Sequence, residues 1–250
     1  MIEDVVIEPM SEQFILWRCL HGGPLSRQTI DQWPPDDSMP WPKFRARNVP
    51  LLRKLIEAYG TCALVARDGD EVVGTLRFYP KALFSTARGA MFCLQQDWPA
   101  GAAEEIAAAD LPPPPELEDR TLVVHCIMTG SPSQKHNPYQ RKGIGQRLVR
   151  ALASWAAQRG WEAIEVTTHE DLDVLYAITG SAGKGFWAKL GFRLIKAEPE
   201  PAFEEAGDLL RTMREEADAR GLDPAVVTNR YLMRLDLTRG PAAGGSEEGR

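Results

Sequence analysis

Residues 121–149 read TLVVHCIMTGSPSQKHNPYQRKGIGQRLV, and this stretch decides the fold. Residues 121–128 are a largely apolar run, which predicts a strand near the centre of a sheet. A loop-like segment at 129–143 leads into a helix that ends at Gly160. The apolar residues of this helix share one face and are Ile144, Leu148, Val149, Leu152, Trp155 and Ala156. The stretch therefore predicts a strand, a glycine-containing turn and a helix, in that order.

The turn that opens this helix, at residues 140–145, predicts an anion site. Backbone N–H groups at a helix N-terminus have no partner inside the helix, and the helix dipole is positive there. Gly143 and Gly145 let the backbone approach a ligand closely, while Arg141 and Lys142 add positive charge. The expected ligand is a pyrophosphate. A P-loop or a dinucleotide fingerprint fits less well, because the glycines and lysine they require are not at the needed spacing. An alternative is that the two glycines only shape the helix entry.

The rest of the chain predicts further strands and helices on both sides of this stretch. The clearest is a hairpin, with strands at 61–67 and 71–79 joined by a turn at 68–70. The other expected elements are strands at 2–8, 161–168, 192–196 and 230–237, helices at 11–20, 50–60, 185–190 and 202–220, and an irregular loop at 31–50. An early hairpin followed by strands alternating with helices favours an α/β (α+β) fold with a mixed sheet and helices on both faces.

This pattern is expected to form one domain, residues 1–238. The domain carries insertions at about 84–119 and 200–228. Residues 239–250 are rich in Gly, Ala and Glu and are predicted to form a disordered tail.

Composition excludes several classes of partner. The formal net charge of -6 and the sequence pI near 5.4 provide no basic field for nucleic acid or anionic lipid. No apolar run is long enough to span a membrane, and Glu3 and Asp4 stand where a signal peptide needs positive charge. We therefore expect a cytoplasmic protein with no nucleic-acid or membrane partner.

The cysteines, Cys19, Cys62, Cys93 and Cys126, predict neither a disulfide framework nor a zinc ribbon, because none forms a C-x-x-C pair. No metal is expected. One alternative stays open, which is a metal- or thiol-dependent enzyme assembled by the fold from Cys19, His21, Cys93 and Cys126.

Two motifs in this order resemble the GCN5-related N-acetyltransferase (GNAT) superfamily. Residues 140–145 match its Q/R-x-x-G-x-G/A motif, and residues 186–192, FWAKLGF, resemble its F-Y-x-K-x-G-F segment. The resemblance covers roughly residues 61–80 and 120–197. It implies the GNAT acyl-CoA N-acyltransferase fold, with acetyl-CoA (coenzyme A) as co-substrate.

The resemblance also implies where the cofactor binds, in a gap between the strands at 121–128 and 161–168. The pyrophosphate would contact the amides of residues 141–146, and the pantetheine arm would pair with the main chain near Ile127 and Met128. Trp187 would pack against this arm. The implied cofactor residues are Ile127, Met128, Gln140, Arg141, Lys142, Gly143, Ile144, Gly145, Gln146 and Trp187.

The proton-transfer residues depart from the family pattern. Family members often have an acid at the Tyr of F-Y, but Trp187 stands there, and an indole N–H is not a useful proton source. Tyr176 and Tyr139 are the nearest candidates, and Tyr176 is preferred because it lies in a segment longer than the family usually has. The alternative is that residues 172–178 pack as an added turn of structure.

The strand at 121–128 also lacks the carboxylate that the family often uses as a base. His125 is the candidate there, because the pKa of an unperturbed histidine is about 6.5. A core histidine with satisfied hydrogen bonds is the alternative. The polar residues at 169–173 could also act as base or recognise a cationic amine.

The sequence thus predicts an N-acetyltransferase that acts on the amine of a small molecule or peptide. A non-catalytic acyl-CoA-binding module is the alternative, and a homodimer stays open.

Overall fold

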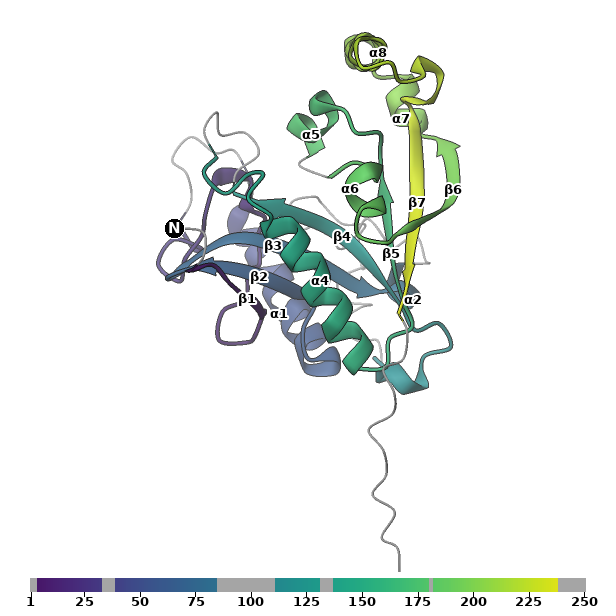
Figure 1. Cartoon of the computed structure of the whole chain (residues 1–250). Coiled ribbons are helices and arrows are strands. Elements are labelled where there is room, and N and C mark those ends of the chain that lie inside the picture. The colour runs from purple at the N-terminus through teal and green to yellow at the C-terminus, as the bar shows by residue number, and fades with distance from the viewer. Residues whose placement is uncertain (1–3, 33–38, 85–110, 131–136, 180–181, 238–250) are drawn as a thin grey trace, which may run out of the picture.

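The computed structural model describes residues 4–32, 39–84, 111–130, 137–179 and 182–237. Its centre is a seven-stranded sheet in the order β1-β2-β3-β4-β5-β7-β6 (Figure 1). The strands are β1 (Val6–Pro9), β2 (Ala63–Asp68), β3 (Glu71–Pro80), β4 (Thr121–Thr129), β5 (Ala163–Thr168), β6 (Arg193–Pro199) and β7 (Asn229–Asp236). All neighbours are antiparallel except β4 and β5, so the predicted mixed sheet is confirmed.

The predicted hairpin and central strand are both present. Asp68 of β2 pairs with Glu71 of β3, and Gly69 in the turn between them has φ 57°. Glycine adopts this left-handed conformation at little cost. β4 is the fourth of the seven strands, as its apolar sequence predicted.

β4 and β5 stay together over only part of their length. Residues 121–124 of β4 pair with residues 163–166 of β5, and the pairing ends there. β4 also carries a bulge, because Arg77 pairs with Cys126 and Phe78 with Val124, which leaves His125 as the extra residue. A bulge bends a strand and increases its local twist. The two strands therefore diverge toward their carboxyl ends.

An ion-pair network around the buried Glu165 lies where β4 and β5 remain paired. The Glu165 carboxylate of β5, with a side chain only 6% exposed, accepts hydrogen bonds from Lys81 Nζ at 3.1 Å and Arg234 Nη1 at 2.8 Å. Lys81 follows β3 and Arg234 belongs to β7. The network thus connects β3 with β7 across the two strands between them.

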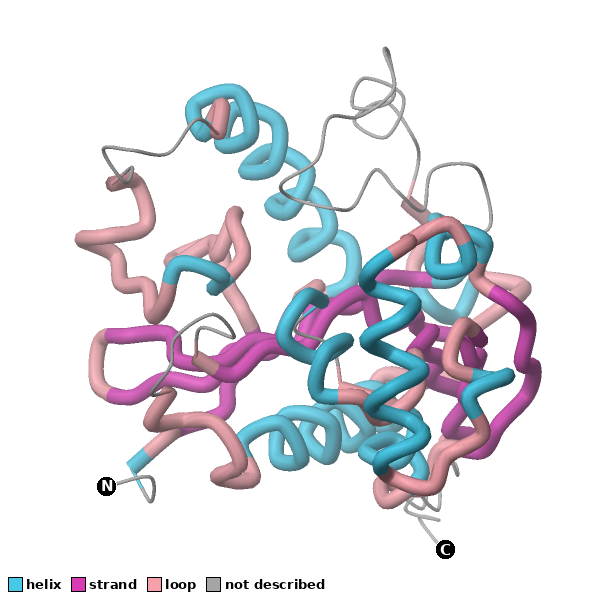
Figure 2. Tube along the Cα trace, turned by 90° about the horizontal axis from the view of Figure 1, so that it is seen from above, coloured by secondary structure: helices cyan, strands magenta, loops and turns pink. Residues whose placement is uncertain are grey.

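Helices cover both faces of the sheet, as predicted. α1 (Trp41–Tyr59) and α4 (Ile144–Gln158) lie on opposite faces in both views (Figures 1 and 2). Every residue predicted for the apolar face of α4 is buried. The remaining helices are α2 (Lys81–Phe84), α5 (Asp173–Thr179), α6 (Lys184–Ala188), α7 (Pro201–Glu204) and α8 (Asp208–Ala219), with 3-10 turns η2 (Leu20–Gly22), η4 (Pro114–Glu116) and η5 (Pro224–Val226).

The predicted boundary between an irregular loop at 31–50 and a helix at 50–60 is wrong. α1 already begins at Trp41, so Pro50 lies inside the helix rather than in its first turn. A proline inside a helix removes one backbone hydrogen bond. Burial of the Trp41 and Phe44 side chains, and a hydrogen bond from Asn48 Nδ2 to the Trp17 carbonyl at 3.0 Å, hold the earlier turns in place.

The helix predicted at residues 11–20 is also absent. This segment has a bridge between Ser11 and Phe14 and then non-helical backbone. Leu16 and Trp17 are both buried although they are adjacent in sequence. Their carbonyls accept hydrogen bonds from Arg77 Nη2 and Asn48 Nδ2, both at 3.0 Å, where a helix would use amides four residues later in the chain.

The insertion at 200–228 forms two helices where one was predicted at 202–220. Gly207, with φ 52°, separates α7 from α8. α8 packs on α5 through a small apolar cluster that is distinct from the main core and contains Leu172, Leu175, Met213, Ala217 and Val227. The insertion is thereby placed beside the carboxyl end of β5.

Some predictions fall on residues that the structure does not describe. They include most of the insertion at 84–119 and the tail at 239–250. Within the described ranges, no helix is both long enough and apolar enough to cross a membrane. The single-domain boundaries stay a prediction.

Candidate active site

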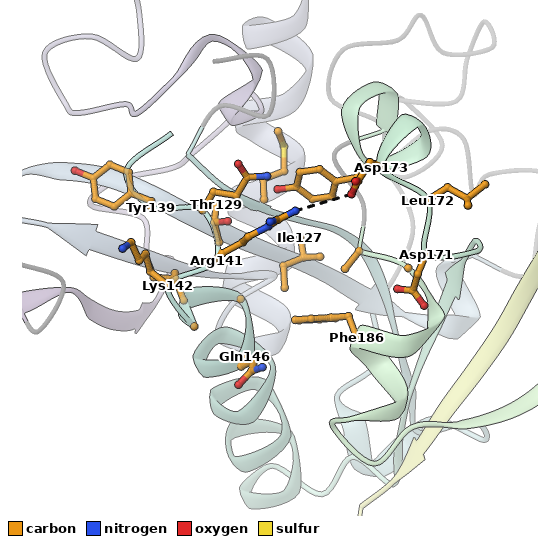
Figure 3. A pocket seen from close by; sticks show the side chains of 18 of the residues that line it. Ile127, Thr129, Tyr139, Arg141, Lys142, Gln146, Asp171, Leu172, Asp173 and Phe186 are labelled. Carbon is orange, nitrogen blue, oxygen red and sulfur yellow. Dashed lines mark ion pairs between the residues drawn. The ribbon is translucent and has the colours of Figure 1, made fainter. Parts of the chain in front are cut away.

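A cavity of about 380 Å³ lies where β4 and β5 diverge (Figure 3). Ile127, Met128 and Thr129 line it from β4. On one side is the loop wall, residues 139–146. On the other is the helix wall, which consists of Asp171, Leu172, Asp173, Tyr176, Ala182, Gly183 and Phe186, and Arg220 also lines the cavity. All the cofactor residues predicted from motif positions line this cavity except Trp187.

The loop wall presents backbone donors at the start of α4. The Arg147 N–H bonds the Gly143 carbonyl at 3.0 Å, so the amides of residues 144–146 precede the first helical hydrogen bond. No side chain of the residues that the structure describes caps this end, and its first turn contains no acidic residue. Arg141, with φ 57°, and Gly143, with φ 79°, both have left-handed backbone conformations. The positive end of the α4 dipole is therefore available to a ligand in the cavity.

The loop wall is held in place by Asn137 and Tyr139. The Asn137 side chain donates to the Thr129 carbonyl at 2.7 Å and accepts from the Tyr139 N–H at 3.0 Å. The Tyr139 hydroxyl donates to Asp68 Oδ2 at 3.1 Å. Burial, together with the Asp68 carboxylate, raises the pKa of Tyr139. These contacts attach the loop to the ends of β4 and β2.

The helix wall begins with a carboxylate that joins the end of β5 to α6. Asp171 Oδ2 accepts the Gly185 N–H at 2.7 Å. A Cβ added at Gly183 would lie 2.7 Å from the Asp171 Cα, which no real Cβ contact tolerates. The glycine at the start of α6 is therefore required for this close approach.

Glu170 fixes the same segment from inside the protein. It is 3% exposed and accepts hydrogen bonds from Lys184 Nζ at 2.7 Å and from the Tyr231 hydroxyl at 3.0 Å. Burial lowers the pKa of Lys184, but the hydrogen bond and charge of Glu170 outweigh it, so that pKa is raised. The sequence pattern at 169–173 therefore combines a structural carboxylate, Glu170, with the cavity-lining Asp171 and Asp173.

Tyr176, the preferred acid candidate, is brought to the cavity by α5. Within the described part of the chain its hydroxyl makes no hydrogen bond, in contrast to that of Tyr139. One charged pair joins the two walls, because Arg141 Nη2 lies 3.9 Å from Asp173 Oδ1 (Figure 3). Both side chains are largely exposed, so this pair adds little stability.

A family model described as the acetyltransferase (GNAT) family matches residues 27–192. The chain belongs to this family. A search of curated protein sequences gives no match.

Solved structures that resemble this GNAT chain are distant in sequence. The IAA acetyltransferase from Bacillus cereus ATCC 14579 is 15% identical over 93% of this chain and 99% of that chain, with a TM-score of 0.42. Ard1 from Thermoplasma volcanium is 12% identical over 94% of this chain and 99% of that chain, with a TM-score of 0.44. A Bacillus subtilis acetyltransferase in complex with CoA is 15% identical over 70% of this chain and 76% of that chain, with a TM-score of 0.35.

Trp187 was expected to contact the cofactor arm, but in this structure its side chain is buried and does not line the cavity. Trp187 is 1% exposed and its indole N–H donates to the Ala182 carbonyl at 3.2 Å. Its ring packs between Phe186 and Phe192, each with a centroid separation of 5.1 Å. Phe186 lines the cavity instead. Neighbouring residues of a short helix point in different directions, so the motif could have indicated Phe186 as the lining residue.

His125 does not reach the cavity either. It is the extra residue of the β4 bulge, and its ring centroid lies 6.0 Å from that of Tyr79. Burial, followed by the charge of Arg77, lowers the pKa of His125 to about 4. A histidine with that pKa is neutral at pH 7 but is a poor match for the proton of an ammonium group. Position and pKa thus agree with the alternative of a core histidine.

The cysteines and histidines do not form a recognisable metal site in the described residues. No group of three or more potential ligands comes together there, and Cys93 lies outside those residues. Cys19, Cys62 and Cys126 are not in disulfides. Burial raises the pKa of Cys62 to about 12, whereas a hydrogen bond with Cys19 lowers that of Cys126 to about 7.

Proposed function

We propose that this GNAT protein transfers an acetyl group from acetyl-CoA to the amine of a small molecule or peptide in the cytoplasm. The observation that carries the proposal is the cavity itself. It combines the open N-terminus of α4 with the end of β4 that no longer pairs with β5, in a chain that belongs to an acetyltransferase family.

Each part of the cavity matches one part of the cofactor. The amides of residues 144–146, with Arg141 and Lys142 beside them, suit the pyrophosphate. Beyond residue 124, β4 has no strand partner on the β5 side among the described residues, so main-chain groups near Ile127 and Met128 are available to the amides of the pantetheine arm. Phe186 and Ile127 provide apolar contact for this arm.

The chemical step is a direct transfer. The uncharged nitrogen of the amine attacks the thioester carbonyl carbon, and the carbon–sulfur bond then breaks. The nitrogen loses its proton to water, and the departing thiolate of coenzyme A accepts a proton. Holding both reactants in one site supplies a large part of the rate increase.

We assign the proton donor for the thiolate to Tyr176. Its hydroxyl belongs to the cavity and has no hydrogen-bond acceptor among the described residues, so it is available to the sulfur. Tyr139 also lines the cavity, but its hydroxyl donates to Asp68. Arg220 balances the charge of Asp173, so the Asp171 carboxylate on the same wall is the group that favours an acceptor that is positively charged before it loses its proton.

The test is release of free thiol when the protein is mixed with acetyl-CoA and a panel of amines. Tyr176→Phe should lower kcat by about 100-fold, because a positioned acid contributes roughly 10²–10⁴-fold. The dissociation constant for coenzyme A should change little. Tyr59→Phe is the matched control, because Tyr59 belongs to α1 and does not line the cavity, and it should keep its turnover.

A second function, non-catalytic acyl-CoA binding, is favoured by one observation. The position where the family often has a tyrosine is occupied by Trp187, which is buried in the core. Tight binding of coenzyme A without thiol release for any amine would support this alternative and overturn the proposed transfer.

A further inference from the structure

The short helix α5 is stabilised from outside itself. It has seven residues, too few to be stable alone, and it carries Tyr176. At its N-terminus the amides of Asp173 and Val174 donate to the two carboxylate oxygens of Glu216, at 2.6 and 3.0 Å. Glu216 belongs to α8, so a residue of the insertion provides the N-terminal cap that a side chain within the same helix usually supplies.

A second residue of the insertion completes this contact. The Arg220 guanidinium donates to the Asp171 carbonyl at 2.5 Å and to Asp173 Oδ2 at 2.6 Å. It also lies 2.8 Å from Glu216 Oε1. Arg220 therefore neutralises the cap carboxylate and holds the turn that leads from β5 into α5.

Apolar packing joins the same two helices. Leu172 and Leu175 pack with Met213 and Ala217 of α8 in the cluster that is distinct from the main core. Leu172 also lines the cavity. The position of the helix wall is thus determined by the insertion as well as by the sheet.

We propose that Glu216 and Arg220 are positioning residues for the reaction. They hold α5 so that the helix wall is closed beside the cofactor and the Tyr176 hydroxyl stays in the cavity. This inference rests on the proposed function, in which Tyr176 protonates the leaving thiolate. It gives the segment between β6 and β7 a role in turnover, although only Arg220 of that segment lines the cavity.

The experiment compares Glu216→Ala and Tyr176→Phe, singly and combined. Glu216→Ala should lower kcat about tenfold, since a displacement of 1 Å can cost about 10²-fold, and should raise the dissociation constant of coenzyme A about threefold. In the Tyr176→Phe background, the same substitution should lower kcat by less than about twofold, because both changes act on the same proton donation by Tyr176.

The matched control is Glu215→Ala. Glu215 is adjacent in α8, is 70% exposed, and approaches Arg211 only at 3.9 Å. This variant should keep the kcat and coenzyme A affinity of the natural protein. Glu216→Gln retains an acceptor oxygen without the charge. Its kcat and coenzyme A affinity should lie between those of the natural protein and of Glu216→Ala. If Glu216→Ala does not fold, Glu216→Gln takes its place in the experiment.

The outcomes separate the inference from the function on which it rests. Unchanged kcat and coenzyme A affinity in a folded Glu216 variant overturn the inference, and so does a full tenfold loss of kcat in the Tyr176→Phe background. If Tyr176→Phe alone keeps full kcat, the assignment of Tyr176 as acid fails. The dissociation constant of coenzyme A then still tests whether Glu216 positions the helix wall, and an unchanged value in the Glu216 variant overturns that role.

Discussion

The loop wall is continuous in sequence, whereas the helix wall depends on residues more than one element away. The loop wall consists of residues 139–146, and its donors are the amides of its own turn. The helix wall needs Gly185 to bind Asp171, and Glu216 with Arg220 to hold α5. The donors of the loop wall are present as soon as α4 forms, and contacts with Thr129 and Asp68 then fix the loop on the sheet. The helix wall is present only when α5, α6 and α8 have all packed together.

The largest effect should come from filling the loop wall. A Cβ at Gly145 would lie 3.5 Å from Phe186 Cζ and 3.6 Å from Ile127 Cδ1, which is ordinary contact, so the protein itself accommodates it. The branches of valine would extend further into the space for the cofactor. Gly145→Val should weaken coenzyme A binding by about 100-fold or more. Its side chain would keep the pyrophosphate away from the backbone amides, so several charge-assisted hydrogen bonds would be lost.

Titration calorimetry with coenzyme A measures this loss, and circular dichroism checks that the fold is retained. Gly145→Ala is the control and should lose far less affinity. An unchanged affinity for Gly145→Val would contradict the placement of the pyrophosphate on this wall.

A smaller effect, with a different signature, is expected in the helix wall. Gly183→Ala places a Cβ 2.7 Å from the Asp171 Cα, so the backbone on one side must move. It should destabilise the protein by about 1–3 kcal/mol, as overpacking usually does, and weaken coenzyme A binding about tenfold. Thermal denaturation and calorimetry measure the two changes.

Gly22→Ala is the control for this substitution, because nothing lies within 4 Å of its added Cβ. It should leave both stability and affinity close to those of the natural protein. If Gly183→Ala changed neither stability nor affinity, the inference that the helix wall is tightly packed at this glycine would be contradicted.

The smallest effect concerns the pair that joins the walls. Asp173→Asn removes the charge that lies 3.9 Å from Arg141 but can still accept the hydrogen bond from Arg220. Coenzyme A should bind about twofold more tightly at low ionic strength, because exposed charges interact weakly and are screened by salt. The gain should disappear at high salt, and a loss of affinity would mean that Asp173 supports the wall rather than competing for Arg141.

The same contrast explains what could be predicted from the sequence. The hairpin, α4 and the loop wall depend on turns, glycines and helical periodicity within short segments, and each was predicted. The cap of α5 joins Asp173 to Glu216, which no local pattern reveals. Trp187 was misplaced because the motif gives the residue type and not the direction in which its side chain points.

The predictions for the N-terminal part of the chain were wrong for a related reason. α1 includes Pro50 because the burial of Trp41 and Phe44 outweighs the lost hydrogen bond. Residues 11–20 are not helical because tertiary partners, Arg77 and Asn48, bind the carbonyls of Leu16 and Trp17. In each case tertiary packing outweighs the local preference of the backbone.

The short pairing between β4 and β5 has a mechanical consequence. The strands β1 to β4 form one half of the sheet and β5 to β7 the other, and in the described part of the chain the strand pairing between the halves is confined to residues 121–124 of β4. The Lys81–Glu165–Arg234 network stiffens that junction. Because β4 and β5 do not pair beyond Val124 and Val166, a change in the width of the slot at the other end would break no hydrogen bond between these two strands.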